Sequence, residues 1–107
     1  MDLSHSENLI LRHILESPSY LESCRKEFFK NESFGHIFIM AKDFWNKFHE
    51  MPSGEQLIEA LKLTGDSDRV EKTEIRSLFE IDLTKYEEDW LRETTEFFIE
   101  YKNITVS

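Results

Sequence analysis

The spacing of the large apolar residues predicts a long amphipathic helix in the middle of the chain, from about residue 33 to residue 49. These residues recur every three or four positions, as on one face of a helix with about 3.6 residues per turn. They are Phe34, Ile37, Phe38, Ala41, Trp45 and Phe48. If each large member gains about 1.5–3 kcal/mol on burial, the stripe contributes on the order of 10 kcal/mol. We therefore expect this helix to be central and to anchor the core.

Capping signals predict two helices before the central one. Ser4 and Glu7 have the spacing of a capping box, which indicates a helix from there to about Glu16. Pro18 suits the first turn of a second helix. The apolar residues of that second helix are Tyr20, Leu21, Cys24 and Phe28.

Two further helices are expected after the central one. Ser53 and Gln56 form a second capping box, and Gly65 is the natural C-terminal cap of the short helix that follows it. A fifth helix then continues to about Phe79. Its candidate caps are Asp66, Ser67 and Asp68.

The last helix is expected to carry more apolar surface than a small domain can bury. Thr84 and Glu87 have capping-box spacing at its start. Its apolar positions are Tyr86, Trp90, Phe97 and Tyr101 in one stripe, widened by Leu91 and Phe98. Plain core is the ordinary interpretation of such a stripe, and the alternative is a contact with another protein. The candidate interface residues are Trp90, Phe97, Phe98 and Tyr101.

Together these elements predict a single compact all-α domain of about six helices over residues 1–107. Composition supports this fold class, because 13% of the residues are aromatic and only three are glycine. No stretch has the eighteen or so consecutive apolar residues of a membrane helix, and the amino terminus lacks the pattern of a signal peptide. We therefore expect a cytoplasmic protein that does not enter a membrane.

The net charge of −9 argues against direct binding of nucleic acid by this domain. Such binding needs a clustered basic face, and the nearest approach to one is Arg25, Lys26 and Lys30. Acidic residues are interspersed among these three, so a solvated helix face is the favoured interpretation.

No motif indicates catalysis, a metal or a cofactor. None of the three glycines belongs to a phosphate-binding loop, and the histidines have no metal-ligand spacing. Glu32 and His36 are read as a surface pair on one helix. Cys24 lies on an apolar helical face and is read as a buried thiol. The acidic residues of the last helix are read as a solvated face, although a catalytic role for Glu93 and Glu96 is a further hypothesis.

Four stretches in one order resemble the amino-terminal domain of DnaB-type replicative DNA helicases, most closely the T4-type bacteriophage branch. They are residues 17–21, residues 28–29, residues 48–53 with Leu57 after them, and residues 90–98. The third stretch is similar to the family's aromatic-His-x-x-Pro-Ser turn, and the fourth to its Trp-Leu-x-x-Glu-Thr-Glu-x-aromatic string. Thr94 stands where the string has its first glutamate, so that glutamate's role is not carried over.

The resemblance implies a non-catalytic module that supports assembly of the helicase ring and offers a docking surface to primase or a helicase loader. ATP hydrolysis, with its Mg²⁺, and the grip on DNA are then expected in a motor domain that is absent after Ser107. The last helix would begin a hairpin that pairs subunits. If the chain is phage-encoded, the protein is expected in the host cytoplasm. The alternative is a freestanding acidic phage regulator that mimics or binds a replication protein.

Overall fold

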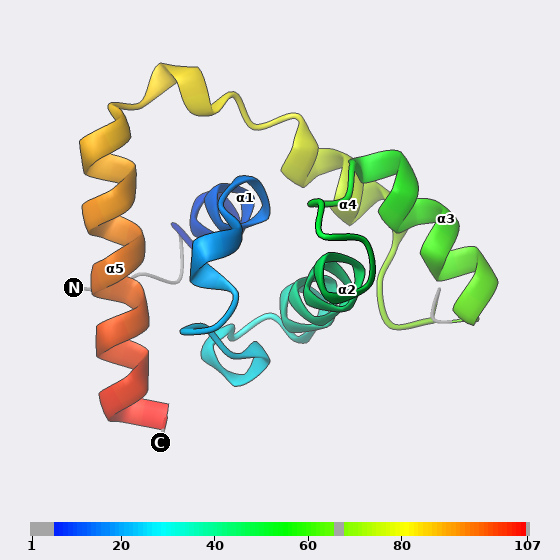
Figure 1. Cartoon of the computed structure of the whole chain (residues 1–107), viewed down its shortest axis with the longest axis horizontal. Coiled ribbons are helices and arrows are strands. Elements are labelled where there is room, and N and C mark those ends of the chain that lie inside the picture. The colour runs from blue at the N-terminus through cyan, green and yellow to red at the C-terminus, as the bar shows by residue number, and fades with distance from the viewer. Residues whose placement is uncertain (1–5, 66–67, 107) are drawn as a thin grey trace.

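The computed structural model describes residues 6–65 and 68–106, and within them it is all-helical, without a β-strand. The five α-helices are α1 (Glu7–Glu16), α2 (Glu32–Phe48), α3 (Gly54–Thr64), α4 (Lys72–Phe79) and α5 (Glu88–Val106). Three short 3₁₀-helices are η2 (Pro18–Tyr20), η3 (Lys26–Phe28) and η5 (Leu83–Lys85). The expected all-α fold is confirmed, in a compact body with extents of 37 × 32 × 26 Å (Figure 1). None of these helices combines the length and apolarity needed to cross a membrane.

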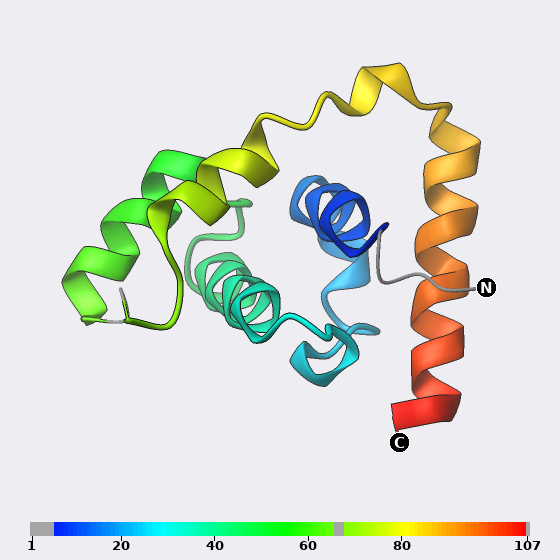
Figure 2. The same cartoon turned by 180° about the vertical axis from the view of Figure 1, so that it is seen from behind.

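The centre of the fold is α1, not the long helix that the apolar stripe had indicated. α1 packs against α5 on one side and against α2 and α4 on the other, as the two opposite views show (Figures 1 and 2). Four of its apolar residues are at most 1% exposed, namely Ile10, Leu11, Ile14 and Leu15. Helix α1 therefore has neighbours around most of its circumference.

Helix α2 has the predicted bounds to within one residue, but only part of its apolar stripe is buried. Ile37, Phe38 and Ala41 are fully buried, whereas Trp45 is partly exposed and Phe48 is 54% exposed. Phe48 is the last residue of the helix. The expectation that Phe48 belongs to the core is wrong.

The predicted second helix is absent, and residues 18–28 form η2, a turn and η3 instead. The segment contains Ser17, Ser19 and Ser23, which favour turns, and Arg25 has an extended backbone that separates the two short helices. Three of the apolar residues of the segment are nevertheless buried, and Tyr20 is partly buried. The three buried residues are Leu21, Cys24 and Phe28.

The capping prediction for α3 is confirmed at both ends. The Gln56 backbone N–H donates to the Ser53 hydroxyl at 3.2 Å, and the Ser53 backbone N–H donates to the Gln56 side chain at 2.8 Å. Gly65 follows the helix in the left-handed conformation, with φ of 73°, which favours glycine because it has no Cβ.

The predicted starts of the next two helices are wrong. Helix α4 begins at Lys72 after a Glu71–Glu74 capping box, because the chain first buries Val70. Asp68 is therefore not its cap. The other candidate caps, Asp66 and Ser67, lie outside the described residues. Helix α5 begins at Glu88. The expected cap Thr84 belongs to η5, where its backbone N–H donates to the Asp82 carboxylate at 3.0 Å.

Glu7 makes a long-range contact that its sequence position does not suggest. It is only 3% exposed, and both of its carboxylate oxygens accept from the Lys30 backbone N–H, at 3.0 and 3.2 Å. Ser4, its expected capping partner, lies outside the described residues. The Glu7 carboxylate thus joins the first turn of α1 to the connection between η3 and α2, and it is well placed for the helix dipole.

We predict that Glu7→Ala lowers the free energy of unfolding by about 1–3 kcal/mol, because the Lys30 N–H loses a charged acceptor in a poorly hydrated place. Glu7→Gln keeps one acceptor oxygen and should lose less. Urea denaturation followed by circular dichroism measures both, with the exposed Glu22→Ala as the control. An unfolding midpoint of Glu7→Ala equal to that of the control would contradict the structural role.

Candidate protein-interaction surface

Helix α5 has an inner face that packs on the core. Its buried residues are Leu91, Thr95, Phe98 and Ile99. The Phe98 ring lies 5.5 Å from the Phe29 ring, and the Lys102 ammonium group lies 5.8 Å from the centre of the Phe98 ring. Phe98 is fully buried, so this candidate interface residue belongs to the core and not to a surface that a partner could reach.

The outer face of α5 and Tyr86, two residues before the helix, carry four exposed aromatic side chains, which we call the aromatic surface. They are 42–45% exposed and comprise Tyr86, Trp90, Phe97 and Tyr101. Tyr86 stacks on Trp90 with ring centres 5.6 Å apart, and Phe97 stacks on Tyr101 at 6.1 Å; both pairs have an interplanar angle of 16°. Each stacked pair thus leaves two partly exposed aromatic rings at the surface.

Helical geometry separates the aromatic surface from the inner face. At about 100° per residue, Trp90, Phe97 and Tyr101 lie within about 40° of one another, and the inner face is centred about 120° away. Helix α5 has 19 residues and so is about 28 Å long, whereas the ten-residue α1 is about 15 Å long. One short helix and η3 cover only one face of α5, and its remaining apolar stripe stays in solvent.

A polar contact fixes the position of α5 on α1. The His13 ring nitrogen Nδ1 lies 2.8 Å from the Thr95 hydroxyl, and the His13 ring packs on Tyr20 with ring centres 5.4 Å apart. Burial lowers the pKa of His13, and the negative charge of Glu88 partly opposes this shift. Burial also raises the pKa of Tyr20, and the nearby Glu96 carboxylate adds to the increase.

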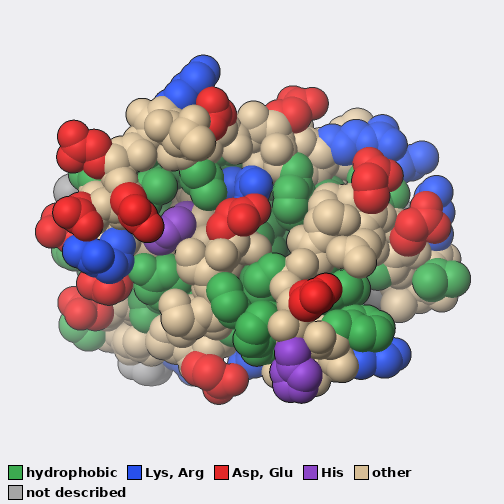
Figure 3. All heavy atoms as spheres, turned by 45° about the horizontal axis from the view of Figure 1, so that its top comes forward, with side chains coloured by type: hydrophobic (Ala, Val, Ile, Leu, Met, Phe, Trp, Pro, Cys, Tyr) green, Lys and Arg blue, Asp and Glu red, His purple; other side chains and the backbone are tan. Residues whose placement is uncertain are grey.

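Acidic side chains border the aromatic surface along one edge. In Figure 3, acidic side chains gather at the left of the molecule, over α5, whereas acidic and basic side chains are mixed at the right. The acidic residues of α5 are exposed, and they include Glu88, Asp89, Glu93, Glu96 and Glu100. Helical spacing places Glu93 and Glu100 beside Phe97, and Thr94 borders the other edge. A partner that covers this surface meets negative charge on one side only.

The other candidate residues from the sequence are spread over the fold. Cys24 is buried, as expected, and burial raises its pKa to about 12, so its thiol stays protonated at neutral pH. The Arg25 guanidinium group lies over the Phe28 ring, 4.9 Å from its centre. Lys26 and Lys30 line a cavity of about 750 Å³ that also includes acidic residues and His36. The acidic residues of that cavity are Glu27, Glu32 and Asp68.

Among the described residues, no three His, Cys, Asp or Glu side chains are grouped in a way that could hold a metal ion. The contacts that position α5 also have no signal in the sequence, because His13 and Thr95 are 82 residues apart. The structure shows Thr95 buried and His13 half-buried, but neither burial can be read from the sequence.

Comparisons of the chain with protein-family models, with curated proteins and with solved structures found no match. The class that the structure defines is therefore an all-α domain whose last helix carries an exposed aromatic surface.

We predict that protonation of His13 destabilises the fold. A histidine whose pKa is lowered in the folded state favours folding fully above its ordinary pKa of 6.5, and this stability is lost as pH falls from there towards the lower folded-state value. Urea denaturation of the wild type and of His13→Gln at about pH 7.5 and about pH 5 isolates this contribution. The wild type should lose more stability than the variant on acidification, and equal losses would contradict the prediction.

Proposed function

We propose that the chain is a non-catalytic amino-terminal module of a phage-type replicative DNA helicase, which supports ring assembly and the docking of primase or a helicase loader. The observation that carries this proposal is the aromatic surface of α5. Two of its four residues, Trp90 and Phe97, lie in the segment with the most extended resemblance to the helicase family, residues 90–98. ATP hydrolysis and the grip on DNA belong, in this proposal, to a separate motor domain.

The physical support for this proposal is that burying large exposed aromatic side chains against a partner protein is energetically favourable. Aromatic residues are enriched in protein interfaces and frequently dominate their binding energy, whereas a small monomer rarely exposes several of them side by side. The two stacked pairs, Tyr86 with Trp90 and Phe97 with Tyr101, are already ordered, so little conformational entropy is lost on contact. A second copy meeting the same surface through a two-fold axis would bury both sets of rings at once.

The acidic edge of the aromatic surface gives this contact a salt dependence. Two copies that meet through α5 bring their Glu93 and Glu100 side chains closer together, and salt screens that repulsion. Self-association should therefore strengthen as salt increases. A basic partner such as a loader would show the opposite trend, because its attraction to the same carboxylates would be screened.

The freestanding acidic regulator is the second candidate, and the acidic side chains over α5 favour it (Figure 3). A regulator of this kind would bind a basic, DNA-binding replication protein through its carboxylates and would not need the aromatic rings. Charge-neutral changes of the aromatic residues therefore separate the two candidates.

We predict that the wild-type chain self-associates at high concentration and that Trp90→Ser with Phe97→Ser weakens the association at least about 30-fold, since loss of central interface aromatics costs about 2 kcal/mol or more. Sedimentation velocity over a concentration series measures this. Leu63→Ser is the matched control, because Leu63 is 86% exposed but lies on α3.

Binding of primase and of the helicase loader is measured on the same proteins by calorimetry. A wild-type chain that stays monomeric at millimolar concentration and binds neither partner would overturn the proposal. Full binding of a basic replication protein by the double variant, together with loss of that binding in Glu93→Gln with Glu100→Gln, would favour the acidic regulator instead.

A further inference from the structure

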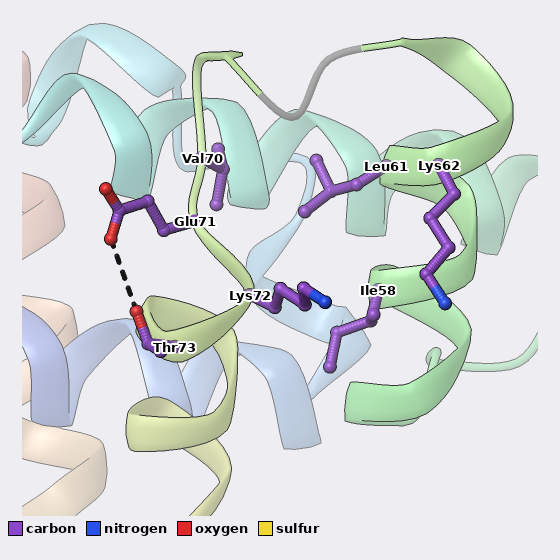
Figure 4. A pocket seen from close by; sticks show the side chains of 7 residues that line it. All are labelled: Ile58, Leu61, Lys62, Val70, Glu71, Lys72 and Thr73. Carbon is purple, nitrogen blue, oxygen red and sulfur yellow. Dashed lines mark hydrogen bonds between the residues drawn. The ribbon is translucent and has the colours of Figure 1, made fainter.

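A second surface, at the other end of the molecule from α5, has an apolar cavity between α3 and the start of α4. Its floor consists of Ile58, Leu61 and Val70, each at most 3% exposed, and its volume is about 330 Å³. Figure 4 shows these side chains entering the same space from α3 and from the segment before α4. A cavity of this size, at the lower end of the range of ligand pockets, accommodates one inserted apolar side chain and its neighbouring backbone.

The charged groups at the opening are lysines. Lys62 approaches from α3, and Lys72 extends across the cavity towards Ile58 (Figure 4). Glu71 also lines the cavity, but its carboxylate points away from the opening, where it accepts from the Thr73 hydroxyl at 3.4 Å and caps α4. The ligand-facing charge is therefore positive, in a chain whose net charge is −9.

The lysines are available to a new carboxylate partner. Lys62 pairs with Glu59 at 3.1 Å, but both side chains are more than half exposed, and such a surface pair contributes little and exchanges easily. Lys72 is exposed at the first position of α4. A carboxylate that approaches the opening thus meets two ammonium groups beside an apolar cavity.

We propose that this cavity binds an acidic peptide segment of a partner protein, which inserts one apolar side chain between Ile58, Leu61 and Val70 and places flanking carboxylates against Lys62 and Lys72. Charge complementarity selects this occupant. The chain as a whole repels acidic segments, so a local pair of lysines around an apolar cavity distinguishes this place from the rest of the surface. The site does not depend on the aromatic surface, because α3 and α5 lie at opposite ends of the fold (Figures 1 and 2).

The test uses three short peptides in which two aspartates flank each side of a central leucine, phenylalanine or tryptophan. Each is titrated into the methyl-labelled wild-type chain and followed by NMR. At least one peptide should shift the methyl signals of Ile58, Leu61 and Val70 at millimolar concentration or below, and leave those of Leu91 and Ile99 on α5 unchanged. The same peptide with a central serine should bind at least about tenfold more weakly, because the apolar insertion is lost.

Two variants separate the charge from the cavity. Lys62→Glu with Lys72→Glu should weaken binding at least about tenfold, and the effect should shrink in high salt. The matched control is Lys47→Glu with Lys85→Glu, which makes the same change of net charge at exposed sites away from the cavity. This control should bind the peptide far better than Lys62→Glu with Lys72→Glu does. Thr73→Trp places a large side chain at the rim from an exposed position and should also weaken binding.

Several outcomes would overturn the proposal. They are the absence of methyl shifts with all three peptides at millimolar concentration, equal binding of the serine peptide, and equal losses in the two double-lysine variants.

Tighter binding of octanoate than of any peptide would indicate a small amphiphile as the occupant. Shifts of the same methyl groups on raising the protein concentration alone would indicate a second copy of the chain. Neither result bears on the α5 contact, which is measured through Trp90 and Phe97.

Discussion

The structure depends on the burial of α1 from several sides at once. This helix has only ten residues, yet α2, α4 and α5 all pack against it. Four of its apolar residues are at most 1% exposed, and Glu7 joins its first turn to the backbone of Lys30. A helix in this position orders the whole domain, but it is too short to cover the length of α5. The aromatic surface is exposed because it lies on the face of α5 opposite to the one that α1 and η3 cover.

The domain consequently has two distinct surfaces at opposite ends. The α5 surface is aromatic and has an acidic edge, which suits contact with a copy of the chain or with a basic partner. The surface between α3 and α4 is an apolar cavity between Lys62 and Lys72, which suits an acidic segment. Because α3 and α5 lie at opposite ends of the fold, the two surfaces do not overlap. Such an arrangement is appropriate for a module that joins subunits to one another and to a further protein.

Local signals in the sequence were sufficient for both ends of α3, but not for the starts of α4 and α5. The Ser53–Gln56 capping box and the Gly65 cap depend on residues within one turn, and both are confirmed. Phe48 could not be assigned from periodicity, because it continues the apolar stripe of α2 and yet is 54% exposed. Periodicity likewise located the aromatic residues of α5 but did not reveal that Phe98 faces the core. That distinction depends on the position of α1. The cavity beside Lys72 also could not be predicted, because it lies between α3 and the start of α4, which only the fold brings together.

The most direct test of the central claim is the solvent accessibility of the α5 side chains as a function of protein concentration. A soluble paramagnetic agent, with relaxation measured by NMR, reports this for each aromatic ring. In dilute protein, Trp90 and Tyr101 should relax strongly and Phe98 should be protected; at high concentration Trp90 and Tyr101 should become protected as well. An exposed Phe98, or rings of Trp90 and Tyr101 that stay equally accessible at every concentration, would contradict the assignment of α5 as a helix with one buried face and one partner-binding face.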